Sequence, residues 1–372
     1  MYLQTLQPLA SPPGSFEADL MKVTGNAKAP FVRRKNCHRA NSIGAVVIGR
    51  NEGERLQRCL ASVTRSGAPV AYVDSDSSDN SLQVASKYEA SVVRLDIANG
   101  FSAAKARNAG ARELGRNVSS AGYIQFVDGD CELDEGWIEQ ATEFLDSNAE
   151  YAVVCGRRRE QFPDASIYNT LCDIEWDTPI GETLSCGGDA LVRVDAFNAV
   201  GGFNEAIIAG EEPELCVRLR QAGWKVFRLN AEMTSHDANM HRFGQWWNRA
   251  KRAGYAYAQG AALHGLSQER HWLRETLRCW VWAFLIPVLA VCLFCMFGSI
   301  ALVFLCLYPL SWLKTFVSAK SRMSTHRAAI WATSCVVSKF PEWLGQIQFL
   351  IRSLGSRGRG GFRPIEYKSV GG

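Results

Sequence analysis

Tyr123-Ile124-Gln125-Phe126-Val127-Asp128-Gly129-Asp130 is the stretch on which the fold prediction rests. Its first five residues are strand-prone and mostly apolar, and two carboxylates separated by one glycine follow them. The pattern predicts a buried strand that presents both acids at its C-terminal end, where open α/β sheets bind their ligands. Two such close carboxylates ionise together most easily around a cation, and their oxygens suit Mg²⁺ or Mn²⁺. A solvated turn would have the same sequence, so the neighbouring segments must decide.

Strands and helices alternate on both sides of this stretch. Strands are predicted at 45–49, 70–73 and 92–95, with a helix after each of them and another from 136 to 147. This alternation from 45 to 147 predicts a doubly wound, mostly parallel sheet. The sequence contains neither the glycine-rich dinucleotide fingerprint nor a P-loop, so metal and side chains would have to hold any phosphate.

Polar residues follow the first two strands and begin the third helix. Asn51 is predicted to cap the helix that contains Leu56, Cys59, Leu60 and Val63. The loop 74–79 offers carboxylates and hydroxyls to a ligand, or is a plain turn in which Asp79 or Ser81 caps the next helix. The helix from 101 to 114 carries cations near its start, which are either solvated or suited to phosphate.

The second half of the chain adds glycine turns and further acids. Strands are predicted at 151–156 and 226–229, and a glycine turn at 187–189 leads into another strand. Three acids begin the helix that follows Gly210, where they favour the helix dipole. One of them, Glu212, is also placed to accept a proton. His236 is predicted to lie in a loop after the last strand, as a structural residue or a metal ligand.

Composition narrows the class of protein. The net charge is +4, and the stretch from 314 onward, with ten cations and two acids, carries +8, which leaves −4 for the rest. A basic end on a mildly acidic body favours binding to an anionic membrane surface. The sequence has no basic stripe with interleaved aromatics, so nucleic-acid binding is not predicted. The 12 cysteines are scattered through apolar runs, which predicts reduced thiols rather than disulfides or zinc. Residues 1–40 lack the apolar run that a signal peptide needs, so none is predicted there.

An apolar stretch dominates the C-terminal third. Residues 280–313 are uncharged and are interrupted only by Pro287, Gly298-Ser299 and Pro309. Two short membrane helices joined at Gly298-Ser299 fit this length, and the cations on both flanks place both ends in the cytoplasm. A buried helical pair of a soluble protein is the alternative. Residues 329–351 are typical of an amphipathic interfacial helix.

The order of these motifs resembles that of the inverting glycosyltransferases of family 2, which have the GT-A fold. The resemblance covers residues 45–260 and rests on several short motifs in the right order. The matching stretches are Ala45–Glu52 (opening strand and Asn-Glu), Val73–Ser81 (nucleotide loop), Ala106–Gly110 (Ala-Arg-Asn-x-Gly), Asp128–Asp130 (metal-binding Asp-x-Asp), Gly187–Asp189 through Gly202-Phe203 (acceptor side), and Gly210–Glu212 (Glu-Asp in the family).

Three departures from the family pattern stand out. Asp76 replaces the usual glycine of the nucleotide loop, so either Asp74 or Asp76 would contact the base. Glu212 stands where the family has an aspartate as catalytic base. The Gln-x-x-Arg-Trp motif of processive synthases is only approximated at 245–249, which argues against a processive enzyme.

The resemblance implies a role for each matching position. It makes Glu212 the catalytic base and gives the metal, Mn²⁺ or Mg²⁺, to Asp130 with His236. The implied donor-binding residues are Asn51, Glu52, Asp74, Asp76, Lys105, Arg107, Asn108 and Asp128. The implied acceptor-binding residues are Gly188, Asp189, Glu211, Trp246 and Trp247, the tryptophans as a sugar platform or interfacial anchor.

We therefore expect a membrane-bound enzyme with a GT-A doubly wound mixed sheet, helices on both faces and C-terminal transmembrane helices. The expected partners are a nucleotide-sugar, preferably a UDP-sugar, and a lipid-linked or glycan acceptor in bacterial surface polysaccharide synthesis. The catalytic domain would lie on the cytoplasmic side of the cell membrane. An inactive nucleotide-binding adaptor and an Asp-x-Asp phosphatase are the alternatives. The expected segments are 1–40 (loosely ordered), 41–265 (catalytic), 266–325 (hairpin), 326–352 (interfacial helix) and 353–372 (disordered).

Overall fold

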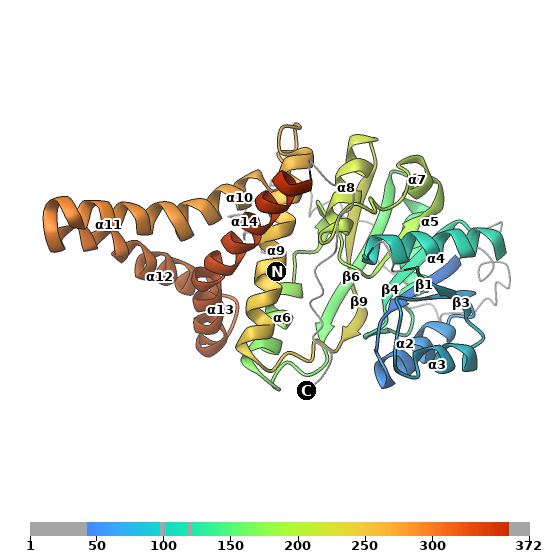
Figure 1. Ribbon diagram of the computed structural model, residues 1–372. Coiled ribbons are helices and arrows are strands. Elements are labelled where there is room, and N and C mark those ends of the chain that lie inside the picture. Colours follow the sequence, from blue (N-terminus) through green and yellow to red (C-terminus); the bar gives the residue numbers. More distant parts are fainter. Residues whose placement is uncertain (1–42, 97–99, 101, 118–120, 357–372) are drawn as a thin grey trace, which may run out of the picture.

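The computed structural model describes residues 43–356 except 97–99, 101 and 118–120 (Figure 1). The segment 1–40 and residues 357–372, for which we expected little order, lie outside the described residues. The strands are β1 (Ile43–Gly49), β2 (Val70–Asp74), β3 (Ser91–Arg94), β4 (Tyr123–Asp128), β5 (Cys131–Leu133), β6 (Tyr151–Glu160), β7 (Gly181–Glu182), β8 (Ala190–Arg193) and β9 (Lys225–His236). The helices of the sheet domain are α2 (Glu54–Thr64), α3 (Ser81–Lys87), α4 (Ala103–Asn117), α5 (Trp137–Ser147), α6 (Ile167–Trp176), α7 (Val194–Ala199) and α8 (Glu211–Gln221).

One nine-stranded mixed sheet forms the centre of the described chain, in the order β3-β2-β1-β4-β8-β6-β9-β5, with β7 paired to β9. β1 lies between β2 and β4 and is parallel to both. These strands are apolar and buried, as parallel strands covered on both faces are. α2 and α4 lie on opposite faces of the sheet (Figure 1). The predicted mixed α/β sheet with helices on both faces is therefore confirmed.

Antiparallel pairing begins at β8, which runs against both β4 and β6. β6 and β9 are parallel and are longer than the sequence pattern indicated. β6 continues past Gly156 to Glu160, and β9 continues to His236. His236 is thus the last residue of a strand, and our expectation that it lies in a loop was wrong.

Two of the expected helix caps are different in the structure. Gly53, not Asn51, is the N-cap of α2, and Asn51 instead holds the neighbouring loop. Asn80 is the N-cap of α3. The carboxylate of Asp79 accepts hydrogen bonds from the backbone and hydroxyl of Ser81, so it orders the turn just before the helix.

The C-terminal third is helical, and part of it extends away from the sheet domain (Figure 1). Its helices are α9 (Phe243–His264), α10 (Leu273–Trp280), α11 (Ile286–Phe297), α12 (Leu307–Lys320), α13 (Thr325–Val337) and α14 (Lys339–Ser356). A π-helical turn joins α10 and α11 into one continuous helix, Leu273–Phe297, the single described helix long and apolar enough to cross a membrane.

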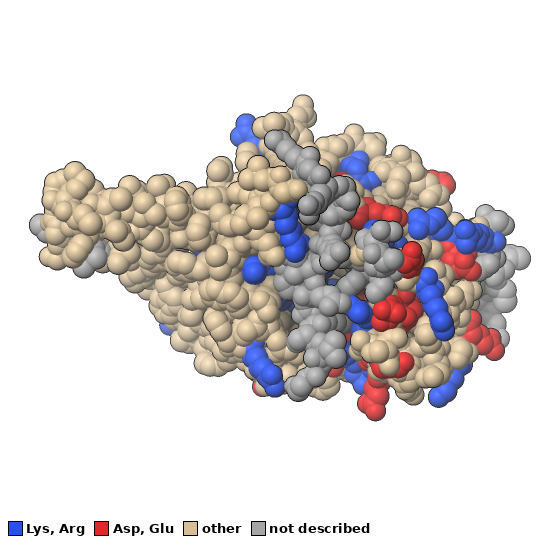
Figure 2. All heavy atoms as spheres, viewed as in Figure 1, with Lys and Arg blue, Asp and Glu red and all other residues tan. Residues whose placement is uncertain are grey.

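The chain reverses at Gly298, as predicted, with a left-handed φ of 66°. The returning arm is a 3₁₀ segment, Gly298–Cys306, followed by α12, so it is not a second regular helix of spanning length. Figure 2 shows no Lys, Arg, Asp or Glu on the visible face of the projecting end, as the uncharged sequence 280–313 requires.

The stretch predicted to be one interfacial helix is in fact two helices, α13 and α14, separated at Ser338. α14 packs tightly on α9, which glycines permit: a Cβ on Gly254 would lie 1.8 Å from the carbonyl oxygen of Glu342. A Cβ on Gly345 would lie 1.9 Å from the carbonyl oxygen of Lys251. A cut at residue 265, the predicted end of the catalytic segment, would therefore uncover the face of α9 that α14 covers. The first residues of the expected disordered tail, 353–356, belong to α14.

Candidate active site

The side chain of Arg107, on α4, lies at the centre of the site and is only 2% exposed. Its Nη2 is 2.7 Å from Oδ1 of Asp128, at the end of β4. Its Nη1 is 2.8 Å from Oε1 of Glu211 and 2.9 Å from Oε1 of Glu212, both in the first turn of α8. One guanidinium thus joins the end of β4 to α8, the helix that carries the expected base.

Glu212 has the electrostatics of a general base. Burial raises the pKa of its carboxyl, the charge of Glu211 raises it further, and Arg107 opposes both, with a resulting pKa of about 7. The preceding residue, Gly210, caps α8 with a left-handed φ of 84°, which lets the chain turn sharply and place the acids next to Arg107. A base with a pKa near the working pH both ionises and accepts protons readily.

Asp189 and Gly188 lie against Asp128. The backbone N–H of Asp128 donates to Oδ1 of Asp189 at 3.0 Å, and Thr234 Oγ1 donates to Oδ2 at 2.8 Å. Asp189 is 0% exposed and its carboxylate accepts hydrogen bonds from within the chain, and an acceptor-binding role for it stays a prediction. A Cβ on Gly188 would lie 2.5 Å from Oδ2 of Asp128, so this buried glycine allows close approach rather than lining an open surface.

Asp130 and His236, the predicted metal pair, are brought together by the pairing of β5 with β9. Oδ1 of Asp130 is 3.4 Å from Nε2 of His236, and together with Cys131 they could hold a metal ion. A second such group combines Cys131 with Asp128 and Asp189. The buried Nδ1 of His236 has no hydrogen-bond partner among the described residues.

The charge balance also fits a divalent cation. Two of the described arginines, Arg107 and Arg158, contact carboxylates of this site. The acids outnumber them: Asp128, Asp130, Asp189, Glu211 and Glu212. An excess of carboxylates at close range stabilises a bound cation.

Glu52 and the nucleotide-loop residues lie at the ends of β1 and β2. The carboxylate of Asp74 is buried and accepts hydrogen bonds from Tyr72 Oη and the backbone of Ser77. Asp76 is exposed and has a left-handed φ of 65°, which explains why glycine is usual at this position. Glu52 is buried beside Arg55 at 2.8 Å.

Asn51 and Asn108 have internal partners rather than open ligand-facing amides. Oδ1 of Asn51 accepts from the backbone of Ser78 at 2.7 Å, which ties the first loop to the second. The amide of Asn108 bonds both backbone groups of Phe203, at 2.8 and 2.9 Å, and so anchors the Gly-Gly-Phe turn. Lys105 donates to the carbonyl of Gly100 at 3.0 Å.

The two tryptophans of α9 differ in burial. Trp246 is 4% exposed and packs in the core between α9 and α6, and Trp247 is half-buried against the same core. An acceptor role for either tryptophan stays a prediction. The sequence could not show which of them is buried, because adjacent residues on a helix point in different directions and only the packing decides which one enters the core.

Arg158, Glu160 and Trp176 are site residues that the sequence analysis missed. Arg158 lies over the ring of Trp176 at 4.7 Å, and that ring meets the ring of His236 edge-on at 4.6 Å. Oε2 of Glu160 is 3.8 Å from Nδ1 of His236. A longer prediction for β6 would have found two of them, since strand alternation places residues 158 and 160 on one face.

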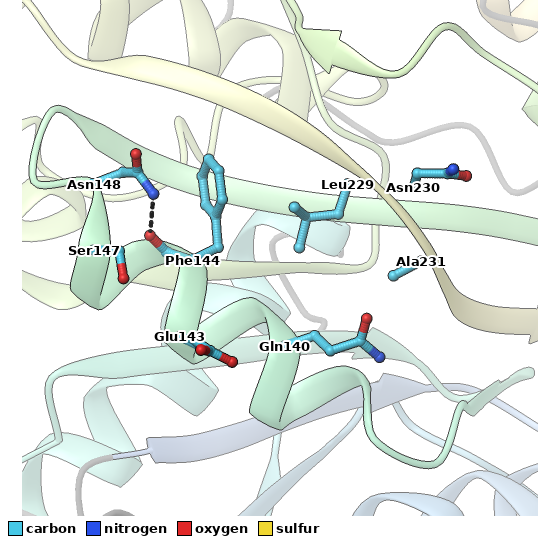
Figure 3. A pocket seen from close by; sticks show the side chains of 8 residues that line it. All are labelled: Gln140, Glu143, Phe144, Ser147, Asn148, Leu229, Asn230 and Ala231. Atoms are coloured by element: carbon cyan, nitrogen blue, oxygen red, sulfur yellow. Dashed lines mark hydrogen bonds between the residues drawn. The ribbon is translucent and has the colours of Figure 1, made fainter. Parts of the chain in front are cut away.

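A shallow groove lies elsewhere, between the C-terminal part of α5 and the middle of β9 (Figure 3). Its lining includes Phe144, Asn148 and Leu229, and Asn148 donates to the carbonyl of Phe144 at 2.7 Å. None of the carboxylates described above lines it. We therefore place the chemistry at Arg107 and its partners.

Comparison with known proteins identifies the kind of domain that carries these residues. The model of the family named Glycosyl transferase family 2 matches residues 45–197, which contain β1 to β8 and the Asp-x-Asp. This segment is a family 2 glycosyltransferase domain. A curated relative, the glycosyltransferase AglE of Haloferax volcanii, is 24% identical over 238 residues, which cover 61% of this chain and 77% of AglE. The predicted family and the predicted class of enzyme are confirmed.

Solved glycosyltransferase structures also resemble the chain, at lower similarity. The mannosyltransferase PcManGT of Pyrobaculum calidifontis, in complex with GDP-Man and Mn²⁺, is 15% identical with a TM-score of 0.49, and the match covers 86% of this chain and 87% of that one. S. aureus TarS 1–349 is 14% identical with a TM-score of 0.46, and the match covers 82% and 91% of the two chains.

Proposed function

We propose that this glycosyltransferase moves a sugar from a nucleotide-sugar to a hydroxyl of a lipid-linked or glycan acceptor, with inversion. The observation that supports the proposal is the contact of Arg107 with both Glu212, the proposed base, and Asp128, the first acid of the Asp-x-Asp. The donor in our proposal is a UDP-sugar, and bacterial surface polysaccharide synthesis is the proposed setting.

Glu212 would act as the base in a single displacement. The acceptor oxygen forms a bond to C1 of the sugar as its proton passes to the Glu212 carboxylate. The bond from C1 to the diphosphate oxygen breaks, and its electron pair stays on the leaving diphosphate. Attack from the face opposite the leaving group inverts the anomeric centre. Arg107 offsets the buried charge of Glu212, so that the carboxylate is available to accept the proton.

Asp130 and His236, with Asp128 beside them, would hold Mn²⁺ or Mg²⁺, which neutralises charge on a leaving diphosphate. Oxygen ligands suit both ions, and an imidazole nitrogen favours transition metals. On the donor side, Asp76 is our choice for the contact with the base or ribose, because it is exposed, whereas the other exposed acid of the loop, Asp79, bonds Ser81. Buried Asp74 holds that loop in shape through Ser77.

The alternatives fit less well. An Asp-x-Asp phosphatase needs Thr or Val soon after the second acid, but Cys131-Glu132 follows here, and the family match points to glycosyl transfer. An inactive adaptor would keep the fold and bind the nucleotide without turnover. The poised pKa of Glu212 favours an active enzyme over an adaptor.

The apolar hairpin would hold the enzyme at the cell membrane with the catalytic domain in the cytoplasm. Large apolar side chains along α11 are exposed, including Val291, Met296 and Phe297. Cations lie on both flanks of the apolar stretch, where the positive-inside rule places the cytoplasm. These flanking cations are Arg270, Arg274, Arg278, Lys314 and Lys320.

The test is an assay of membranes that contain the full-length protein, with a panel of UDP- and GDP-sugars and Mn²⁺. We expect one donor to release its nucleoside diphosphate, and NMR of the product to show the inverted anomer. The Glu212→Gln variant is the matched control. Nucleotide binding without release from any donor in the wild type would instead support the adaptor. A retained anomeric configuration would refute the single displacement.

A further inference from the structure

Arg158 is a buried cation whose hydrogen-bonding capacity is poorly used. Its side chain is only 14% exposed, and its Nε has no hydrogen-bond partner among the described residues. The nearest carboxylate oxygens, on Asp189 and Asp128, lie 3.6 and 3.7 Å away, beyond good hydrogen-bond distance. Its Nη2 donates to Cys131 Sγ at 3.4 Å, and a thiol sulfur is a weak acceptor. The Nε of Arg107 likewise has no partner among the described residues, but its terminal nitrogens make contacts of 2.7 to 2.9 Å with carboxylates.

The position of Arg158 is nevertheless fixed. Its guanidinium lies 4.7 Å over the ring of Trp176, and the edge of that ring system packs on His236. Nη2 of Arg158 contacts the thiol of Cys131, which belongs to both groups of candidate metal ligands. The guanidinium thus lies between Cys131, the residue after Asp130, and Trp176, which packs on His236.

We propose that Arg158 binds the diphosphate of the nucleotide-sugar and stabilises it as it leaves, with Trp176 as the residue that positions it. This inference rests on the proposed function and adds a residue to it. Phosphate oxygens match the planar donor fork of arginine and would accept from the terminal Nη groups of Arg158, while its buried Nε faces Asp189. Charge on the diphosphate grows as its bond to C1 breaks, so a fixed cation there favours departure.

The neighbours of Arg158 provide a matched control. Arg157 and Arg159 stand next to it on β6 but pair with Asp177 rather than with the acids of the site. Arg159 is 40% exposed and bonds Glu232 at 3.0 and 3.1 Å. An exposed pair of this kind contributes little to stability, so Arg159→Met removes the same charge from the same strand without touching the site.

The experiment measures binding of UDP, GDP, UMP and GMP to the full-length protein by calorimetry in saturating Mn²⁺. For Arg158→Met we expect the nucleoside diphosphate that the wild type binds to lose at least tenfold in affinity, and its monophosphate less than threefold. Arg158→Lys keeps a cation near Asp189 and is expected to stay folded with an intermediate loss. Arg159→Met should bind like the wild type. Melting temperatures report whether each variant is folded.

The outcomes separate the possible roles. Equal losses for diphosphate and monophosphate would mean that Arg158 only balances Asp189, and would overturn the inference. Unchanged diphosphate binding in both Arg158 variants would overturn it as well, while leaving the proposed function intact. A wild-type protein that binds neither UDP nor GDP would refute the proposed function, and this inference with it. If Arg158→Met does not fold, the diphosphate-to-monophosphate comparison in Arg158→Lys decides.

Discussion

Nη1 of Arg107 lies 2.9 Å from Oε1 of Glu212, while the other terminal nitrogen of the same guanidinium holds Asp128. The proposed base and the first acid of the Asp-x-Asp therefore share one buried cation. Because that cation lowers the pKa of Glu212 against the effects of burial and of Glu211, any change that moves Arg107 should alter both sites together.

We predict that Glu212→Gln binds donor normally but loses turnover by about 10²–10⁴-fold, the usual contribution of a general base. The amide keeps the shape and polarity of the side chain but cannot accept the proton. Turnover and donor affinity would be measured separately. The comparison variant is Glu211→Gln, which touches the same nitrogen of Arg107. Full turnover in Glu212→Gln would move the base to Glu211, Glu214 or Asp189.

The pH dependence of kcat/KM should follow the ionisation of Glu212. Its pKa is raised to about 7, and the deprotonated form is the active base. We therefore expect kcat/KM to fall by about tenfold per pH unit on the acid side and to level off above neutrality. The residual activity of Glu212→Gln should lack this acid limb. An acid limb that persists in that variant would assign the titration to another group.

Asp130→Ala and His236→Ala should each abolish Mn²⁺ binding and transfer while the protein stays folded. Each variant removes one of the two proposed metal ligands, whose Oδ1 and Nε2 atoms lie 3.4 Å apart. Mn²⁺ titration followed by electron paramagnetic resonance measures the binding directly. Glu132→Gln, which lies close by but pairs with Arg58, is the control and should bind like the wild type. Asp130→Ala with full activity after chelator treatment would contradict the metal assignment.

Gly188→Ala and Gly187→Ala form a pair of adjacent substitutions with opposite expected results. A Cβ on Gly188 would come within 2.5 Å of Asp128 Oδ2 and 2.7 Å of Arg107 Nη2, so both must move. We expect at least a tenfold loss of kcat and a destabilisation of about 1–3 kcal/mol. A Cβ on Gly187 meets only Arg158 Nη1, at an ordinary 3.8 Å, and activity should stay within threefold. Similar kinetics for the two variants would show that Asp128 and Arg107 tolerate displacement.

The full-length protein should stay with membranes through a wash in about 1 M salt, which screens electrostatic attachment, and leave only with detergent. Val291→Lys should weaken this retention, because a charge within the bilayer costs about 2.5–3.5 kcal/mol. Val291 is 64% exposed on α11, and Val92→Lys, at an exposed site of the sheet domain, is the control. Release of the wild type by salt alone would contradict insertion of the hairpin.

Much of the fold follows from local sequence. Apolar runs that end in acids gave β1, β2 and β4, because buried parallel strands need continuous apolar segments. The spacing of Leu56, Cys59, Leu60 and Val63 predicted the buried face of α2, and all four are buried. The reversal at Gly298 followed from the only glycine in an otherwise apolar run.

Contacts between distant segments could not be read in this way. β6 and β9 run past the residues that local pattern indicates, because pairing with each other, rather than apolar content, sustains their polar ends. α14 returns to α9 through close backbone contacts at glycines, which carry no signal in a single sequence.

The sequence by itself determined which residue types the site holds: the Asp-x-Asp, the acids at the start of α8, and the arginine and asparagine of α4. Only the tertiary structure decided what each does. It used Asp189, Asn108 and Asp74 to hold the backbone, buried Trp246, and brought Arg158 and Trp176 beside His236. The physical reason is that a polar side chain is committed by the nearest partner in space, and those partners lie on segments far apart in the chain.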